Sequence, residues 1–502
     1  LVRAPHYYLN NRQIFVNKIN ELFSTYREEI LRKQEETVDE GGRDILVESC
    51  NKGTTMLEFE LLTHQKIVRD YLNLYTPYRG LLLYHGLGSG KTCSSIAVAE
   101  GMKSAKKIIV MTPASLQRNY VEQLKECGDP MYVKNQFWKF VSLKSNEHLL
   151  DELSAILSIP KSFIREKQGA WMVNVNNEPN YESLSSQDKN RLNVQLNKMI
   201  TAKYTFINYN GLRTKKLDEI SDNGKINPFD GAVVIIDEAH NFISRIVNKI
   251  KKPDSLSMRL YEFLMSAEKA RIVLLSGTPI INYPNEIGIL FNILRGYIKT
   301  WSMPLNVKTK GKVNEAVIKK LLTGPSIRGA VDYIDYKPST KMLKVTRNPF
   351  GFESVNKGRS YKGVHLNILG DVTDEEVIND IQDTLSKNGI EVIRTGMSVN
   401  RYKALPDVLD EFQQHFVNIK TGEIKNKKLF QRRILGLVSY FPDIKELMPS
   451  FDKEKDITVL NIPMSDYQFG VYESARVQER KIETRNSRKK ARGGKNGVYE
   501  DS

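Results

Sequence analysis

The stretch LLLYHGLGSGKTCSS, Leu81–Ser95, joins an apolar run, a glycine-rich turn and the start of a helical pattern. A strand, a tight turn and a helix in this order gather backbone N–H groups and the positive end of the helix around a phosphate. In such a loop we expect Lys91 to reach the β- and γ-phosphates of a nucleotide and Thr92 to place its hydroxyl on Mg²⁺. The other loop positions that would surround the phosphates are Gly86, Gly88, Ser89 and Gly90.

The loop departs from the strict phosphate-binding pattern at one position, where it has His85 in place of glycine. The chemical interpretation is a nucleoside triphosphatase. The structural alternative is a glycine-rich turn that packs a helix closely on a sheet. Two further segments favour the first interpretation.

The first of them, AVVIIDEAH, places two carboxylates directly after the apolar run Ala232–Ile236. This run is typical of a buried parallel strand, and α/β sheets hold their ligands at the carboxyl ends of such strands. We expect Asp237 to hold the Mg²⁺ that Thr92 also touches, and Glu238 to orient and deprotonate the attacking water. The alternative for these acids is a charged helix start.

The second segment, LLSGTP at Leu274–Pro279, again follows an apolar run, Ile272–Leu275. The hydroxyls of Ser276 and Thr278 are suited to hydrogen-bond the two acids and relay the state of the phosphates. Their alternative is a polar exit from a strand into a turn. Three strands that end in polar residues predict one cleft on a RecA-like, doubly wound parallel α/β sheet of the P-loop type.

With these segments the chain resembles the superfamily 2 DEAH-type helicases and translocases, and within them the Snf2-like branch, through SGTPIINYPNEIGILFNIL at Ser276–Leu294. The resemblance implies that ATP hydrolysis drives movement along nucleic acid, and that Gln65, in LLTHQKIVRDYL, reads adenine. By itself, Gln65 is typical of a solvated helix position. The resemblance also implies that three residues couple hydrolysis to movement, namely His240, Ser276 and Thr278.

The segment IIVMTPASLQRNYVEQL, Ile108–Leu124, is similar to the strand and turn with which the family contacts the phosphate backbone of the bound strand. This similarity makes four residues candidates for nucleic-acid binding: Thr112, Pro113, Ser115 and Gln117. Their alternative is an ordinary connection between a strand and a helix.

A narrower resemblance is to the DNA-dependent ATPases of large cytoplasmic DNA viruses, of the poxvirus early transcription factor and nucleoside triphosphatase I type. It is carried by LLTHQKIVRDYL, by NNRQIFVNKINELF at Asn10–Phe23 and by LFQRRILGLVSYF at Leu429–Phe441. It implies an enzyme that uses ATP and Mg²⁺ and favours DNA over RNA. It further implies a role in viral transcription beside a viral RNA polymerase or a second transcription factor subunit, in the host cytoplasm, viral factory or virion.

Composition agrees with this interpretation. The 502 residues are 40% hydrophobic, enough for a large core in two to four domains, and no apolar run approaches the roughly 18 residues of a membrane span. A net charge of +16 is typical of a protein that binds a polyanion. Cys50, Cys93 and Cys127 have no metal-ligand spacing and predict no disulfide framework, as in a reducing compartment, and Cys93 is expected to be a small packing residue.

We expect the chain to be organised in five parts. These are a helical leader over 1–44, a first RecA-like ATP-binding domain over 45–295 with a helical insertion at about 146–203, a linker or insertion over 296–370, the start of a second RecA-like domain over 371–470, and a basic flexible tail over 471–502. The leader is dominated by a charged amphipathic helix, about Arg12–Glu36, that is expected to pack on the first domain. Five apolar runs are expected to be strands: Leu81–Tyr84, Ile108–Met111, Tyr204–Ile207, Ala232–Ile236 and Ile272–Leu275.

In the family, a complete motor carries an arginine motif, QxxGRxxR, in its second half, and the 502 residues contain none. The chain also begins with Leu1, and both ends suggest a fragment. Because a cleft arginine contributes about 10³–10⁵ in rate in related P-loop enzymes, we expect this chain to bind Mg-ATP and nucleic acid but to hydrolyse ATP slowly. Alternatively Arg432 and Arg433 supply the charge, although a helix face that binds phosphates or acidic neighbours is the favoured interpretation.

Three classes of function are open at this point. The leading one is an ATP-driven translocase on nucleic acid. The second is a nucleotide-gated nucleic-acid-binding subunit with little turnover, and the third is a bacterial restriction or repair motor of the same superfamily.

Overall fold

The computed structural model describes residues 19–21, 23–29, 62–72, 78–86, 88–145, 147–309, 311–322, 330–347, 352–357, 360–366, 373–418, 421–441, 455 and 457–491. The chain divides into two compact units, Leu1–Glu446 and Leu447–Ser502. Within the described ranges, no helix combines the length and the apolar character that crossing a lipid bilayer requires.

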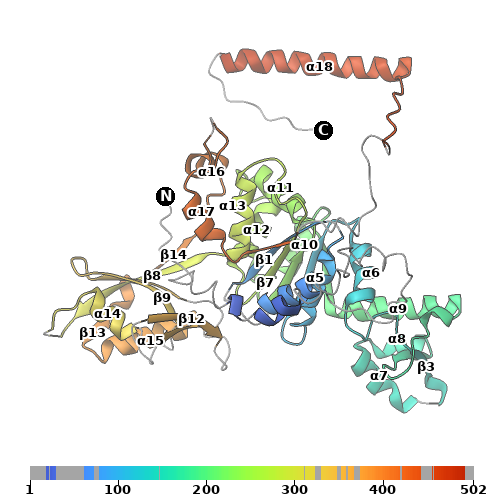
Figure 1. The fold of residues 1–502 in the computed structure, drawn as a ribbon, viewed down its shortest axis with the longest axis horizontal. Coiled ribbons are helices and arrows are strands. Elements are labelled where there is room, and N and C mark those ends of the chain that lie inside the picture. The colour runs from blue at the N-terminus through green and yellow to red at the C-terminus, as the bar shows by residue number, and fades with distance from the viewer. Residues whose placement is uncertain are drawn as a thin grey trace, which may run out of the picture. The chain divides into compact units, whose positions relative to one another are not determined.

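Six parallel strands form the central sheet of the first unit, in the order β15-β1-β7-β6-β2-β5 (Figure 1). Their bounds are Gly80–His85 (β1), Lys107–Thr112 (β2), Tyr204–Asn208 (β5), Ala232–Ile236 (β6), Arg271–Leu275 (β7) and Val438–Phe441 (β15). The five strands expected from apolar runs are therefore confirmed, as is the doubly wound parallel α/β fold. The sixth, β15, was not expected, because its run of four residues is short and follows a charged helix.

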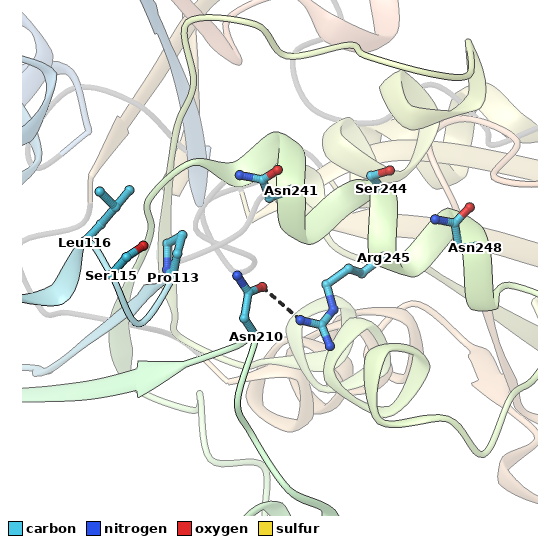
Figure 2. A pocket seen from close by; sticks show the side chains of 8 residues that line it. All are labelled: Pro113, Ser115, Leu116, Asn210, Asn241, Ser244, Arg245 and Asn248. Atoms are coloured by element: carbon cyan, nitrogen blue, oxygen red, sulfur yellow. Dashed lines mark hydrogen bonds between the residues drawn. The ribbon is translucent and has the colours of Figure 1, made fainter. Parts of the chain in front are cut away.

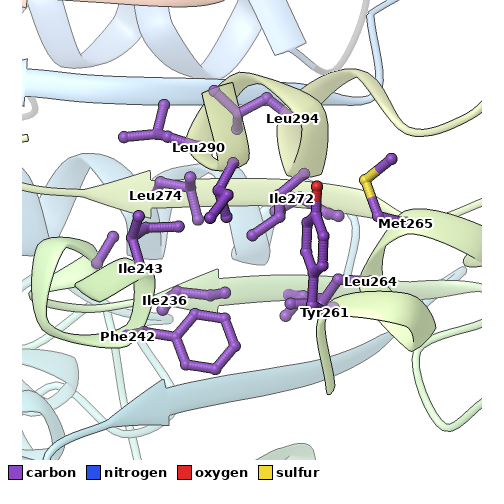
Figure 3. Packing of buried hydrophobic residues seen from close by; sticks show 14 of the residues in the cluster. Ile236, Phe242, Ile243, Tyr261, Leu264, Met265, Ile272, Leu274, Leu290 and Leu294 are labelled. Atoms are coloured by element: carbon purple, nitrogen blue, oxygen red, sulfur yellow. The ribbon is translucent and has the colours of Figure 1, made fainter. Parts of the chain in front are cut away.

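Alternate residues of each strand face opposite sides of the sheet, and helices cover both sides. Val234 and Ile236 of β6 pack with one layer of helices, whereas Val233 and Ile235 pack with the other. Figure 3 shows the first side, where Phe242 lies close to the sheet. The helices on that side are α11 (Ala239–Lys249), α12 (Leu256–Ser266) and α13 (Asn285–Arg295), and those on the other side are α5 (Lys91–Glu100), α6 (Gln117–Cys127) and α9 (Ser186–Lys203).

The expected insertion at about 146–203 is mostly helical, but it also contributes a strand, β4 (Gly169–Val173), which pairs antiparallel with β3 (Trp138–Ser142) just before the insertion. Its helices are α7 (Leu150–Leu157), α8 (Lys161–Glu166) and α9. Ser185 caps α9, because its hydroxyl accepts a hydrogen bond from the backbone N–H of Asp188 at 3.1 Å. Short 3₁₀ turns lie at Leu143–Ser145, Glu147–Leu149, Tyr181–Ser183 and Arg394–Gly396.

Residues 298–402 differ from the expected linker and second parallel domain. Their main sheet is antiparallel, in the order β13-β8-β10-β9 with β14 also on β8. In this sheet β9 and β10 are consecutive strands joined by a tight turn, a connection open to antiparallel but not to parallel pairs. Strand β8 instead pairs with strands that come later in the chain. The elements are β8 (Ile298–Val307), α14 (Glu315–Leu322), β9 (Val331–Lys337), β10 (Met342–Arg347), the hairpin β11 (Phe352–Lys357) and β12 (Ser360–Leu366), α15 (Asp374–Ser386), β13 (Ile390–Val392) and β14 (Ser398–Tyr402).

The chain then returns to the first sheet. Residues 404–407 cross α13, where the side chain of Asn292 exchanges two hydrogen bonds of 2.8 Å with the backbone of Leu405. Helices α16 (Leu409–Phe416) and α17 (Lys427–Ile434) follow, and β15 pairs with β1. The described part of 371–470 thus forms no second parallel sheet, and in this part of the chain the expected start of a second RecA-like domain is not seen.

Three smaller expectations concern the leader, the cysteines and the tail. Of the expected leader helix, residues 19–21 and 24–29 are helical, residue 23 is in a turn, and the others lie outside the described residues. Glu29 accepts a hydrogen bond from the Thr63 hydroxyl at 3.0 Å. Cys93 is buried as expected, but it forms a disulfide with Cys127, because α5 and α6 pack side by side. Of the expected flexible tail, residues 471–491 are instead helical, as part of α18 (Asp466–Ala491), whose sequence is rich in the helix formers Glu, Arg and Lys; residues 492–502 lie outside the described residues.

Candidate functional site

The phosphate loop runs from the end of β1 to the start of α5. Gly88 and Gly90 have φ angles of 75° and 71°, which lie in the left-handed region that favours glycine. A Cβ on Gly90 would lie only 2.4 Å from Nε2 of Gln65. Gly90 is also the N-cap residue of α5, so the free N–H groups of the first helical turn are available to a ligand in the loop.

The side chain of Lys91 is held inside this loop. Its Nζ donates hydrogen bonds to the carbonyl oxygens of His85 at 2.9 Å and Gly86 at 3.0 Å. The hydroxyl of Ser89 donates to the Gly86 carbonyl at 2.7 Å. The loop therefore places an ammonium group where the sequence predicts phosphate binding, and Thr92 follows as the second residue of α5.

Gln65 lies against the phosphate loop. It is in α4 (Thr63–Asp70), only 2% of its surface is exposed, and its Nε2 donates to the carbonyl oxygen of Gly90 at 3.2 Å. Its Oε1 accepts a hydrogen bond from the backbone N–H of Leu62 at 2.9 Å. These contacts exclude the solvated helix position, whereas the reading of adenine by Gln65 stays a prediction.

His85, the residue that departs from the pattern, turns its imidazole toward β15. Its Nε2 lies 2.9 Å from the hydroxyl of Ser439, and its backbone carbonyl remains free to bind Lys91. Beside it, the ring of His64 stacks on that of Phe441 with centroids 4.1 Å apart, while His64 Nε2 hydrogen-bonds the Ser89 carbonyl at 2.9 Å. Sequence patterns missed this support, because β15 comes more than 300 residues after the loop.

The two acids of the DEAH segment follow β6. The Asp237 Oδ1 accepts a hydrogen bond from the backbone N–H of Glu238 at 3.0 Å. Burial, with the neighbouring Glu238 adding, raises the pKa of Asp237 to about 6, and the positive charge of Lys91 opposes this rise. Asp237 is therefore a partly buried carboxylate beside a second acid, and the positive charge of Lys91 only partly offsets the cost of its negative charge.

The SGTP segment contacts the DEAH segment. The hydroxyl of Ser276 lies 3.0 Å from Nδ1 of His240, which is also 3.4 Å from a carboxylate oxygen of Glu238. Thr278 takes part through its backbone N–H, which donates to the Ser276 hydroxyl at 3.0 Å. A Cβ on Gly277 would lie 3.9 Å from Lys91 Nζ, so all three motif segments meet at one end of the sheet.

This geometry fits a nucleoside triphosphate with Mg²⁺. The loop offers glycines in left-handed conformations and an ammonium group. A bound Mg²⁺ would balance the negative charge of the Asp237 carboxylate. Among the described residues, no group of three or more His, Cys, Asp or Glu side chains is placed to hold a metal by itself. An ion at Asp237 and Thr92 would thus take its other ligands from phosphate and water, as Mg²⁺ commonly does.

A polar pocket of about 500 Å³ opens beside the DEAH helix (Figure 2). Among its described lining residues, Arg245 carries the one charged side chain, and its Nη1 donates to Oδ1 of Asn210 at 2.8 Å. The lining residues come from the turn after β2, the turn after β5 and α11: Pro113, Ser115, Leu116, Asn210, Asn241, Ser244, Arg245 and Asn248.

Two of the four predicted strand-binding residues, Pro113 and Ser115, line this pocket. Thr112 does not, because it is fully buried and its hydroxyl donates to the Pro113 carbonyl at 3.1 Å. Gln117 begins α6, outside the pocket lining. The residues from α11 were missed, because an amphipathic helix after DEAH carries no signal that separates a ligand-facing residue from a solvated one.

Arg433 is a structural residue. It is 7% exposed, its guanidinium donates to the carbonyl oxygen of Ala404, and its own carbonyl accepts a hydrogen bond from Arg295 at 2.8 Å. This position ties α17 to the segment that crosses α13, so a role for Arg433 as the missing cleft arginine is not supported. The side chain of Arg432 lies outside the described residues.

Comparison with protein families matches residues 49–309 to the SNF2-related domain. A protein of Acanthamoeba polyphaga mimivirus named as an ATP-dependent RNA helicase, R563, is 27% identical over 347 residues, which cover 66% of this chain and 50% of the relative. A protein of Invertebrate iridescent virus 3 named as a helicase, 087L, is 24% identical over 74% of this chain and 34% of its own length. The termination factor NPH-I homolog of African swine fever virus is 23% identical over 55% of this chain and 31% of its own.

Among solved structures, the SWI2/SNF2 ATPase core of Sulfolobus solfataricus in complex with dsDNA matches 47% of this chain and 36% of its own, at 15% identity and a TM-score of 0.24. The chain spans about half the length of the mimivirus relative and about a third of the other two viral relatives.

Proposed function

Because the chain belongs to the SNF2-related domain family, we propose that it is a motor that hydrolyses ATP and moves along nucleic acid, with DNA favoured over RNA. One observation carries the proposal: the phosphate loop, the DEAH acids and the SGTP turn meet at one end of the sheet, and a polar pocket opens beside them. A nucleotide would bind where the three segments meet, and a nucleic-acid backbone would bind in the polar pocket. The two sites would thus lie at neighbouring strand ends of one sheet.

In this proposal the residues of the nucleotide site have separate tasks. Lys91 neutralises the β- and γ-phosphates while the N–H groups of the loop hold them, and Gln65, at the edge of the loop, reads adenine. Asp237 and Thr92 hold Mg²⁺, which supplies charge neutralisation at the transferred phosphate when bound. Glu238 orients the attacking water and accepts its proton.

Coupling to nucleic acid involves the contacts between segments. The Ser276 hydroxyl touches His240, and the amide of Asn282, in the same turn, donates to the Ser244 hydroxyl at 3.0 Å. Ser244 lines the polar pocket, so the turn after SGTP touches both sites. We assign the pocket to a backbone phosphate of the bound strand, with Arg245 as its cation.

The matched relatives support a viral setting. One is named as a termination factor homolog and others as helicases, all from DNA viruses. A role in viral transcription, beside a viral RNA polymerase or a second transcription factor subunit, follows as part of the proposal. The site of action would then be the host cytoplasm, the viral factory or the virion.

The test is ATP hydrolysis by the chain without nucleic acid and with duplex DNA, single-stranded DNA or RNA, together with a nucleotide-binding assay. We expect Mg-ATP binding and slow turnover, which DNA increases most. Lys91→Ala should lower kcat about 10²–10³-fold, because it removes a preorganised charge from the phosphates. Turnover that Lys91→Ala leaves unchanged would place hydrolysis elsewhere and refute the assignment of the site.

A second variant separates a motor from a nucleotide-gated binding subunit. Glu238→Gln keeps the size of the side chain and removes the base, so a motor should bind ATP normally but lose both turnover and movement on DNA. A binding subunit would instead keep its ATP-dependent nucleic-acid affinity and every function that depends on it.

A further inference from the structure

The DEAH turn is conformationally strained. Glu238 has a φ of 47°, in the left-handed region that non-glycine residues rarely occupy. It is the N-cap residue of α11, and its carboxylate is the one proposed to orient water. A strained residue keeps its conformation only where its surroundings hold it, so the contacts of this turn determine where the carboxylate lies.

Tyr209 holds this turn. Its hydroxyl lies 3.1 Å from the carbonyl oxygens of both Asp237 and Glu238, and only 2% of the residue is exposed. Its ring packs against Phe242 of α11, with centroids 5.5 Å apart. Because carbonyl oxygens can only accept hydrogen bonds, the Tyr209 hydroxyl is the donor to both of them.

The next residue along the chain reaches the polar pocket. Asn210 lines the pocket and accepts a hydrogen bond of 2.8 Å from Arg245, the pocket's cation. Arg245 and Phe242 both belong to α11, which begins at the DEAH turn. Tyr209 and Asn210 are therefore adjacent residues in the turn directly after β5. Tyr209 is hydrogen-bonded to the DEAH turn, and Asn210 is hydrogen-bonded to Arg245 of the pocket.

We propose that Tyr209 is a positioning residue for ATP hydrolysis. In this proposal, Tyr209 and Asn210 also couple the binding of a nucleic-acid phosphate in the pocket to the conformation of the DEAH turn. A phosphate that binds the Arg245 guanidinium competes with Asn210 for its N–H donors. The main chain at 209–210 then adjusts, and with it the hydroxyl that holds the carbonyl oxygens of Asp237 and Glu238. This inference rests on the proposed function and names its coupling residues.

The experiment compares Tyr209→Phe with wild type in the full chain. Three quantities are measured: kcat and KM for ATP with and without duplex DNA, and the ratio of the dissociation constants of a non-hydrolysable ATP analogue without and with DNA. We expect kcat to fall about tenfold with KM within twofold, as for loss of one orienting hydrogen bond. The ratio of dissociation constants should fall toward 1, because coupling between two binding sites is reciprocal.

Tyr204→Phe is the matched control. Tyr204 is the first residue of β5, the strand that Tyr209 directly follows. It is as buried as Tyr209 and donates its hydroxyl to Glu100 at 2.7 Å, on the other side of the sheet. It should lose comparable stability in thermal unfolding and keep both kcat and the coupling ratio. Asn210→Ala should also lower the ratio, because it removes the hydrogen-bond partner of Arg245.

The outcomes are distinguishable. If wild type binds ATP and responds to DNA while Tyr209→Phe matches it in kcat and in the ratio, the positioning role is overturned and the proposed function stands. If Tyr204→Phe reduces coupling as much as Tyr209→Phe, the effect is a general loss of stability and the proposal also fails. If wild type neither binds ATP nor responds to any nucleic acid, the proposed function itself is wrong.

Discussion

His85 shows how a single residue can replace a pattern position without breaking the site. The pattern has glycine there, yet His85 is the last residue of β1, and the loop uses only its carbonyl oxygen, which binds Lys91. The imidazole is buried against Ser439. Burial is the main cause that lowers the pKa of His85 to about 4, and electrostatic repulsion from His64 and Lys91 adds to it.

This pKa predicts a pH-dependent stability. Between about pH 6.5 and pH 4 the unfolded chain binds a proton at position 85 that the folded chain does not, so stability falls as pH falls through this range. From pH 7 to pH 5 the loss due to His85 should be about 2 kcal/mol. Urea unfolding of wild type and His85→Asn at both pH values measures it. Equal pH dependence in the two proteins would show that His85 titrates normally.

Among the elements, α13 depends on a close approach to the segment 404–407. Asn292 pairs with the backbone of Leu405, and the Asn285 amide donates to the Asp407 carbonyl at 2.8 Å. Gly288 lies between these contacts along α13. Because it has no side chain, the backbone of Pro406 can lie against the helix. The segment that follows continues to α16, α17 and β15, so this crossing positions the edge strand beside the phosphate loop.

The crossing predicts a cost for any side chain at position 288. A Cβ there would lie 2.1 Å from the carbonyl oxygen of Pro406, a backbone atom that cannot rotate away. Gly288→Ala should therefore lower the free energy of unfolding by about 1–3 kcal/mol, the usual range for overpacking. Gly211→Ala is the control, because its Cβ would meet no atom within 4 Å. Chemical denaturation of the two variants measures the difference. Equal unfolding midpoints would contradict a close approach of Pro406 to α13.

At the scale of the whole molecule, charge is the main feature. The net charge of +16 is spread over the chain, because residues 471–502 hold nine Lys or Arg and five Asp or Glu, nine minus five leaving four. A broadly basic body favours association with a polyanion through release of counterions. Within the first unit, the polar pocket with Arg245 is where this general attraction would become a defined contact.

Binding to duplex DNA should therefore weaken with salt, with log K falling linearly against log salt concentration. Arg245→Ala should reduce the magnitude of the slope by about 1, as expected for one lost phosphate contact. Arg165→Ala, an exposed arginine on α8, removes the same charge away from the pocket and should leave the slope near the wild-type value. Fluorescence anisotropy across a salt series measures both, and identical slopes for the two variants would remove Arg245 from the interface.

The sequence by itself determined the parallel sheet and most of the nucleotide site. Apolar runs followed by polar residues predicted five of the six strands, because a strand buried on both faces needs consecutive apolar residues. Lys91, Asp237 and Ser276 could be found because their chemistry depends on local spacing along one strand and its turn. The structure brings those three segments together, and their roles in catalysis stay predictions.

Only the tertiary structure decided what depends on distant contacts. It placed β15 beside β1, made the sheet of residues 298–402 antiparallel, and joined Cys93 to Cys127. It also hydrogen-bonded Tyr209 to the DEAH turn and Arg245 to Asn210. None of these follows from a local pattern, because pairing at a sheet edge and hydrogen bonds between separate strands depend on which elements pack together, and that choice is made by the whole core.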